Sequence, residues 1–178
     1  MDAKDLIEKA KSGDSDAFGK LYESYYLPIY RYIHFRIDKK DDVQDLVQIV
    51  FLKVYESLEK YEERGKNPLA YFFTVARNTV IDYQRKKPTL KLYEETHLEG
   101  EEKYTPEYFA KINEETEIVD KAIKTLKGEQ REVILLKYIA GFSNSEIAKQ
   151  IGKSEDSIRQ IQHRALKILR TKLSKLYE

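Results

Sequence analysis

The chain has 178 residues, which is enough for one domain or two small ones. It has no cysteine, which excludes disulfides and thiolate zinc sites, and its 7 glycines and 4 prolines leave little material for a turn-rich β protein. Lysine and arginine number 32 against 31 aspartates and glutamates, so the net charge of +1 does not suggest indiscriminate DNA binding.

The first 20 residues are rich in charge and show no secretory signal. The longest stretch without a charged side chain is residues 67–76, whereas a membrane span needs about 20 apolar residues. We therefore expect a cytoplasmic protein without membrane insertion.

Apolar residues recur at helical spacing through the N-terminal half, and no alternating strand pattern with turn residues appears. Asp14 and Asp41 are of a residue type that caps helix N-termini. The pattern predicts a helical bundle. One short helix and three longer apolar stripes are expected at residues 3–11, 18–33, 43–58 and 69–83.

The helical pattern fails between Pro88 and Pro106. Residues 89–111 contain six glutamates and three lysines, a net charge of −3, and no clear apolar stripe. Such a segment is typical of a linker. We therefore expect one domain over residues 1–88, an acidic linker over 89–111, and a second domain over 112–178.

The second domain is predicted to contain a helix-turn-helix. Ser143 to Glu146 has the pattern of a capping box, and Gly152 permits the positive φ of a tight turn. The spacing leaves the last helix free to enter a major groove. The predicted fold class is thus all-α, with two small helical domains joined by a linker. The helices of this domain are expected at residues 113–126, 129–140, 144–151 and 155–175, and the apolar contacts of the motif at Ile147, Ile151, Ile158 and Ile161.

The last helix has a polarised charge. Residues 153–175 contain seven basic residues against two acidic ones, a net charge of +5. Its outward face carries arginine and glutamine, the side chains that hydrogen-bond base edges in pairs, and its N-terminal turn can point at a phosphate. We therefore expect this helix to read DNA. The candidate residues are Ser154, Asp156, Arg159, Gln160, His163, Arg164 and Lys167.

Two segments of the first domain carry a resemblance to a known family. "DDVQDLVQIVFLKVYESLEKY" at residues 41–61 and "YFFTVARNTVIDYQRKK" at residues 71–87 resemble the second conserved region of bacterial RNA polymerase sigma factors. The helix-turn-helix, beginning near "LKGEQREVILLKY", resembles the fourth region. A chain with these two regions and no additional domains is similar to the extracytoplasmic-function class of the sigma-70 family.

This resemblance implies a sigma factor that binds core polymerase, recognises two promoter elements and directs transcription initiation. It implies no enzymatic activity, catalytic residue, metal or cofactor. The implied partners are bacterial RNA polymerase core, promoter DNA in double- and single-stranded form, and an anti-sigma factor.

The resemblance also assigns candidate residues in the first domain. The polymerase contact would involve Asp45 and Gln48, which lie three apart on one helix face, and Phe51, which could serve either the partner or the core. The promoter melting element would be recognised near an aromatic residue and an amide that reads a base edge, with basic side chains on the adjoining phosphates. These melting candidates are Tyr61, Arg77, Asn78, Arg85, Lys86 and Lys87.

The sequence departs from the family at two places. Ile49 stands where the family often has an acidic residue, which either weakens the case for the standard polymerase contact or indicates a packed apolar one. Ile161 and Gln162 stand where many members of the class have a basic residue followed by an apolar one. The promoter preference therefore cannot be copied from one subgroup.

Two other functions compete with this interpretation. A helix-turn-helix regulator with an N-terminal sensor or dimerisation domain explains only the C-terminal half. An enzyme is disfavoured because the three histidines are far apart in sequence and no phosphate loop or nucleophile motif appears. Asp41, Asp42 and Asp45 suit the N-terminus of a helix better than a metal site.

Overall fold

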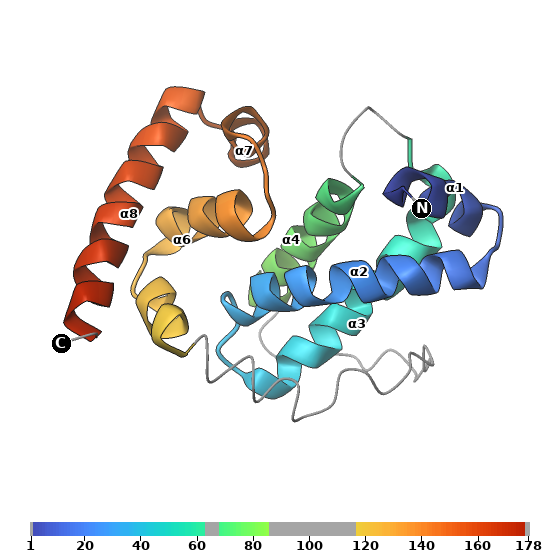
Figure 1. Ribbon diagram of the computed structural model, residues 1–178, viewed down its shortest axis with the longest axis horizontal. Helices are drawn as coiled ribbons and strands as arrows, with labels where there is room; N and C mark the ends of the chain where they lie inside the picture. The colour runs from blue at the N-terminus through green and yellow to red at the C-terminus, as the bar shows by residue number, and fades with distance from the viewer. Residues whose placement is uncertain (1, 63–67, 86–116, 177–178) are drawn as a thin grey trace. The chain divides into compact units, whose positions relative to one another are not determined.

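The computed structural model describes residues 2–62, 68–85 and 117–176 (Figure 1). Every regular element in these residues is a helix, which confirms the all-α prediction. The chain divides into two compact units, Met1–Leu98 and Glu99–Glu178. The predicted linker, residues 89–111, lies outside the described residues. None of the described helices combines the length and the apolar character needed to cross a bilayer.

The described residues of the first unit, 2–62 and 68–85, form α-helices close to where the sequence predicts them. Helices α2, α3 and α4 pack against one another, and α1 packs against α2 and a short 3-10 turn, η1, that follows α3 (Figure 1). The elements are α1 (Ala3–Lys11), α2 (Ser15–His34), α3 (Lys40–Ser57), η1 (Leu58–Lys60) and α4 (Leu69–Arg85).

One of the two predicted N-caps in this unit is confirmed. The Asp14 carboxylate accepts a hydrogen bond from the Ala17 amide at 3.0 Å, which begins α2. The prediction for Asp41 is wrong, because α3 begins at Lys40 and its N-cap is Lys39, whose side chain makes no cap bond. Asp41 lies instead in the first turn, where its negative charge still favours the positive end of the helix dipole.

Aromatic rings fill the core of the first unit. Phe51 of α3 lies 4.4 Å from the ring of Tyr22 on α2 and 5.6 Å from that of Phe72 on α4. Tyr32 and Phe73, both fully buried, join α2 to α4 in an edge contact at 5.5 Å. Ring contacts of this kind add stability beyond the apolar area they bury. The three long helices are therefore held in a defined arrangement.

The second unit is a smaller bundle with an aliphatic core. Its first described helix covers residues 117–124 and precedes the helix that begins at Gly128. Leu126, Ile134 and Ala165 form its buried cluster, and Ile168 and Leu169 pack against it. The remaining elements are α6 (Gly128–Ile134), which continues into a π-helical turn, η2 (Leu135–Ile139), then α7 (Asn144–Ile151) and α8 (Glu155–Leu176).

Candidate functional site

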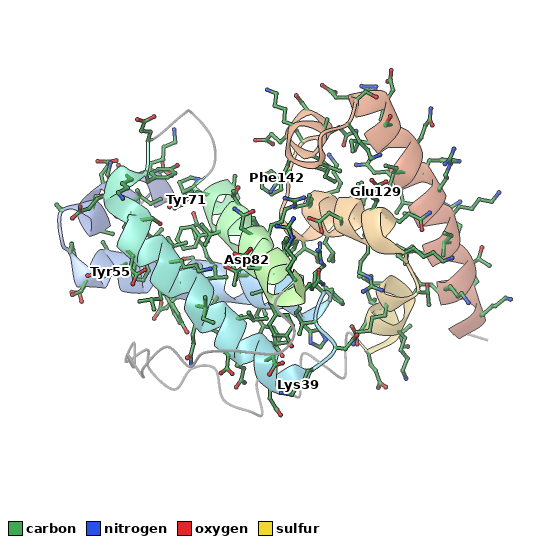
Figure 2. The ribbon with its side chains drawn as sticks, turned by 180° about the vertical axis from the view of Figure 1, so that it is seen from behind. Lys39, Tyr55, Tyr71, Asp82, Glu129 and Phe142 are labelled. Atoms are coloured by element: carbon green, nitrogen blue, oxygen red, sulfur yellow. The ribbon has the colours of Figure 1, made fainter. Side chains whose placement is uncertain are left out.

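The outer face of α3 presents polar side chains next to apolar ones. Asp45 and Gln48 are exposed, as predicted from their spacing. Further along the same face, Leu52 is half-buried and Tyr55 is 47% exposed, with its ring 5.0 Å from that of Phe18. Figure 2 shows Tyr55 on the outside of the first unit. This surface, Asp45, Gln48, Leu52 and Tyr55, is called the α3 face below.

Phe51 does not belong to the α3 face. Its side chain is fully buried among rings from α2 and α4. Of the two surfaces that Phe51 could serve, its side chain therefore lies on the core side. Val47 and Val54, one turn away on either side, are equally buried, so position 51 belongs to the core stripe. Ile49, where the family often has an acid, is half-buried.

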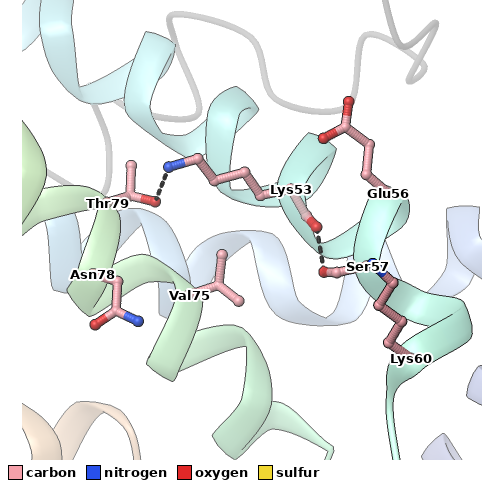
Figure 3. Close-up of a pocket in the computed structure, with 7 residues that line it drawn as sticks. All are labelled: Lys53, Glu56, Ser57, Lys60, Val75, Asn78 and Thr79. Atoms are coloured by element: carbon pink, nitrogen blue, oxygen red, sulfur yellow. Dashed lines mark hydrogen bonds between the residues drawn. The ribbon is translucent and has the colours of Figure 1, made fainter.

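A pocket of about 330 Å³ lies between α3 and α4 (Figure 3). Lys53 of α3 extends across it and donates a hydrogen bond to the Thr79 hydroxyl on α4 at 3.4 Å. Asn78 also lines the pocket, and its side chain is exposed to solvent. The wall thus combines an amide, which donates and accepts, with ammonium groups. The lining residues are Lys53, Glu56, Ser57, Lys60, Val75, Asn78 and Thr79.

Tyr61 is joined to this pocket by a short chain of contacts. Its ring lies 5.0 Å from the ring of Tyr71, and the Tyr71 hydroxyl is 2.6 Å from the hydroxyl of Ser57, which lines the pocket. The Ser57 hydroxyl also donates to the carbonyl of Lys53. The structure therefore brings Tyr61 and Asn78 to one region, as the sequence predicted.

The predicted basic residues are more dispersed. Arg77 is half-buried, and its charge acts on the buried hydroxyl of Tyr32, so it lies toward α2 and is not among the pocket residues. Burial raises the pKa of Tyr32, while the charges of Arg36 and Arg77 act in the opposite direction. Arg85 is exposed at the end of α4. Lys86 and Lys87 lie outside the described residues.

Asp42 is occupied by two hydrogen-bond donors. The Tyr83 hydroxyl at the end of α4 and the Lys39 ammonium, 2.9 Å away, both donate to its carboxylate. The hydrogen bond from Tyr83, followed by the one from Lys39, holds the pKa of Asp42 below its ordinary value. The bond between Tyr83 and Asp42 also raises the pKa of Tyr83. Within residues 2–62, 68–85 and 117–176, no group of three or more acidic, histidine or cysteine side chains is arranged to hold a metal ion.

The helix-turn-helix has the local geometry that its sequence predicts. Ser143 and Glu146 form the reciprocal capping box at the start of α7, and Gly152 adopts φ +75° at its end. The Ser154 hydroxyl accepts from the Ser157 amide at 3.2 Å and so caps α8. Ile147 and Ile158 are fully buried between the two helices, whereas the predicted contacts Ile151 and Ile161 are only half-buried.

The outward face of α8 is exposed along its length. The Arg159 guanidinium lies 3.4 Å from the Glu155 carboxylate and 3.1 Å from that of Asp156. Gln162, on the inward side, donates to the Asn144 side chain of α7 at 2.9 Å. An amide at position 162 thus joins the two helices of the motif. All the predicted DNA-reading residues are exposed: Ser154, Asp156, Arg159, Gln160, His163, Arg164 and Lys167.

The structure adds residues that the sequence analysis did not select. Tyr55 continues the α3 face seven positions after Gln48, a spacing that is visible in the sequence. Lys53 and Lys60 line the pocket, but their position depends on α4 meeting α3, which no local pattern reveals.

Comparison with known proteins agrees with this two-part architecture. The family model for sigma-70 region 2 matches residues 21–88, and the model for sigma-70 region 4 matches residues 116–169. These two regions, in this order, define a DNA-binding transcription initiation factor. The chain belongs to the sigma-70 family of RNA polymerase sigma factors, and its relatives are of the extracytoplasmic-function class.

Two curated relatives and one solved structure illustrate the similarity. The sigma factor BldN of Streptomyces coelicolor is 30% identical over 167 residues, which cover 93% of this chain and 63% of BldN. SigX of Bacillus subtilis is 28% identical over 169 residues, 92% of this chain and 87% of SigX. The structure of CnrH in complex with the cytosolic domain of CnrY aligns with a TM-score of 0.67 at 25% identity, over 99% of this chain and 97% of CnrH.

The family confirms the function expected from the sequence, a sigma factor for transcription initiation. RNA polymerase core and promoter DNA are the partners that membership of the family implies. The alternative of a helix-turn-helix regulator with a sensor domain is not favoured, because the region 2 match occupies the N-terminal half.

Proposed function

We propose that this sigma factor binds polymerase core through the α3 face, opens promoter DNA at the pocket between α3 and α4, and reads an upstream element with α8. The observation that carries this division is that two regions of one family form two compact units with separate exposed surfaces. The working boundaries are residues 1–88, a linker over 89–111, and residues 112–178.

The α3 face has the composition of a protein interface. Tyr55 is a large amphipathic side chain that is nearly half exposed, and tyrosine is enriched where interfaces gain most of their energy. Asp45 and Gln48 on the same face offer hydrogen bonds that would fix the register with the partner. Phe51 would contribute to this interface indirectly, because its buried ring supports the part of α3 that carries these residues.

The pocket suits one base of the opened strand. Its volume of about 330 Å³ is in the range of small-molecule sites, and the Asn78 amide can read a base edge. Lys53 and Lys60 add positive charge for the sugar-phosphate backbone. Arg85, Lys86 and Lys87 stay candidates for phosphate contacts on the grounds of the sequence alone. Tyr61 and Tyr71 supply an aromatic surface on which a neighbouring base can stack.

The two DNA-reading surfaces would bind weakly if each acted alone. Polymerase core would hold both units at a fixed separation and so raise the effective concentration of the second contact. We also propose an inhibitory protein partner, an anti-sigma factor; the CnrH complex with the cytosolic domain of CnrY supports a protein partner. The chain would work in the cytoplasm, by binding and without catalysing a reaction.

Purified bacterial core polymerase tests the first part of this proposal. The full chain should co-purify with core, and the double variant Asp45→Ala/Gln48→Ala should not. Asp82→Ala/Gln84→Ala, which removes the same two residue types from exposed positions on α4, should still co-purify. If the wild-type chain neither binds core nor directs initiation from a promoter library, the proposal is wrong.

Permanganate footprinting of unpaired thymines tests the second part. Asn78→Ala and Tyr61→Ala should retain core binding and reduce strand opening. Unchanged footprints for both variants would mean that Asn78 and Tyr61 have a structural role and take no part in strand opening.

A further inference from the structure

Lys11, the last residue of α1, makes a contact that neither its sequence position nor the proposed function explains. Its ammonium donates a hydrogen bond to the backbone carbonyl of Tyr61 at 3.1 Å, although the two residues are 50 positions apart. The same ammonium pairs with Glu8 at 3.3 Å, and the Lys11 side chain is only 24% exposed. A lysine usually leaves its ammonium in water, so this partly buried placement needs a reason.

The carbonyl that Lys11 binds lies where the chain leaves η1. The Tyr61 amide closes η1 by donating to the Leu58 carbonyl at 3.0 Å, so both the backbone N–H and the backbone carbonyl of Tyr61 are hydrogen-bonded. Lys60, the residue directly before it, lines the pocket between α3 and α4. The Tyr61 ring continues through Tyr71 to Ser57 on the same pocket wall, by a ring contact and a hydroxyl contact of 2.6 Å.

Helix α1 can serve as a fixed support for this contact. Leu6, Ile7 and Ala10 are buried, and α1 packs against both α2 and η1. Its last turn therefore has a defined position relative to the wall of the pocket. A charged donor on a carbonyl makes a stronger hydrogen bond than a neutral one, particularly when it is partly shielded from water.

We propose that Lys11 is a positioning residue for the pocket: by holding the Tyr61 carbonyl, it fixes Lys60 and the Tyr61 ring where a single-stranded base is bound. This inference rests on the proposed function of the pocket and adds to it a role for α1. Lys11 itself lies outside the pocket lining and acts only through Tyr61.

Four variants separate the carbonyl contact from its surroundings. Lys11→Met keeps most of the side-chain length and removes the donor, so the Tyr61 carbonyl loses this partner. Lys11→Arg restores a charged donor. Lys9→Met removes the same charge from an exposed position on the same helix, and Glu8→Gln removes only the ion pair.

The assay uses each variant as holoenzyme with purified bacterial core polymerase and a pool of single-stranded DNA randomised over the melting element. Lys11→Met should lower selectivity at the most strongly selected position by about three- to tenfold, the effect of one hydrogen bond. Core affinity and the midpoint of thermal unfolding should change little. Lys11→Arg should regain most of the selectivity, and Lys9→Met and Glu8→Gln should resemble the wild type.

Two results would overturn the inference. One is that Lys11→Met and Lys9→Met give the same selectivity. The other is that Lys11→Met loses core affinity and thermal stability in proportion to DNA binding, which a merely structural lysine would do. Asn78→Ala, measured in parallel, distinguishes a failure of this inference from a failure of the function proposed for the pocket. If it lowers selectivity while Lys11→Met does not, only this inference fails; if neither has an effect, the function proposed for the pocket fails as well.

Discussion

The two units of this sigma factor are stabilised in different ways. Nine of the 14 tyrosines and five of the 7 phenylalanines precede residue 89, and most of their rings lie in or against the core of the first unit. In residues 117–176 the only tyrosine is Tyr138 and the only phenylalanine is Phe142. The side chains buried there are mostly aliphatic, among them Leu126, Ile134 and Ala165, and Phe142 is the one buried ring in that range.

This difference fits the tasks proposed for the two units. Opening DNA requires a surface that keeps its shape while a base is pulled from its stack, and interlocked rings across α2, α3 and α4 give such rigidity. Presenting one helix to a groove requires only that α8 be held at the correct angle. Aliphatic packing of α8 against α6 and α7 holds this angle, together with a capping box, a left-handed glycine and the link between Asn144 and Gln162.

The largest effect on stability is expected in the aromatic core. Phe51→Ala should lower the free energy of unfolding by about 3–5 kcal/mol, because a buried ring in contact with two helices is lost. Phe51→Leu should cost less than half of that. Urea unfolding followed by tyrosine fluorescence measures both, since the chain has no tryptophan. A stable Phe51→Ala protein that fails to bind core would instead support a direct contact with polymerase.

In the second unit, the loss of one side chain's hydrogen bonds to backbone carbonyls should be measurable. The Arg131 guanidinium donates to the Lys124 carbonyl at 2.7 Å and to the Leu126 carbonyl at 3.0 and 3.2 Å. Arg131→Met should cost about 1–3 kcal/mol, because these carbonyls lose a charged donor. Amide hydrogen exchange in residues 117–176 measures the loss. Arg170→Met, at an exposed position on α8, is the control, and equal effects of the two variants would contradict the role of Arg131.

Two glycine substitutions, one in each unit, should have opposite signs because the backbone angles of the two glycines differ. Gly152 has φ +75° and open space around its Cβ position, so Gly152→Ala should cost about 1–2 kcal/mol through backbone strain alone. Gly19 lies on the exposed side of α2, also with open space, so Gly19→Ala should stabilise the chain by about 0.5–1 kcal/mol. Thermal unfolding of both variants checks the signs, and a stabilising Gly152→Ala would refute the strain argument.

The sequence predicted the helices of both units because their apolar residues repeat at helical spacing and their ends carry strong signals such as the Ser143 capping box. It did not settle which side Phe51 occupies. Residue 51 belongs both to the apolar stripe and to a motif shared with the family. Only the packing of α2 and α4 against α3 shows that its side chain faces the core. Periodicity reports what lies on one helix face and does not report which helix covers it.

The candidate site was predictable to a similar extent. The exposure of Asp45, Gln48 and the outward face of α8 followed from local spacing. The pocket between α3 and α4 did not, because it exists only where two helices meet. The contact of Lys11 with Tyr61 spans 50 residues and involves a backbone carbonyl, which leaves no pattern in the sequence. The predicted cap at Asp41 missed the observed N-cap, Lys39, by two residues, because local patterns fix helix ends less well than helix interiors.

The smallest expected effect concerns the polar anchor of the first unit, whose contribution to stability is present at neutral pH and is lost in acid. Asp42 accepts from Tyr83 and Lys39, chiefly from Tyr83, and its pKa is lowered from 3.8. A lowered carboxyl pKa in the folded state means that this contribution to stability is complete above pH 3.8 and is lost as the pH falls through the folded pKa. The stability difference between wild type and Asp42→Asn should therefore be constant near neutral pH and shrink below pH 3.8.

Urea unfolding of the full chain at pH 7 and pH 3 measures this difference. Tyr83→Phe should remove part of the same effect, and the double variant should cost less than the sum of the two single variants, because they share one hydrogen bond. Tyr138→Phe, at an exposed ring in the other unit, is the matched control. A difference between wild type and Asp42→Asn that stays constant down to pH 3 would show that the Asp42 charge does not anchor α4 to α3. The aromatic core would then hold the first unit together without this polar link.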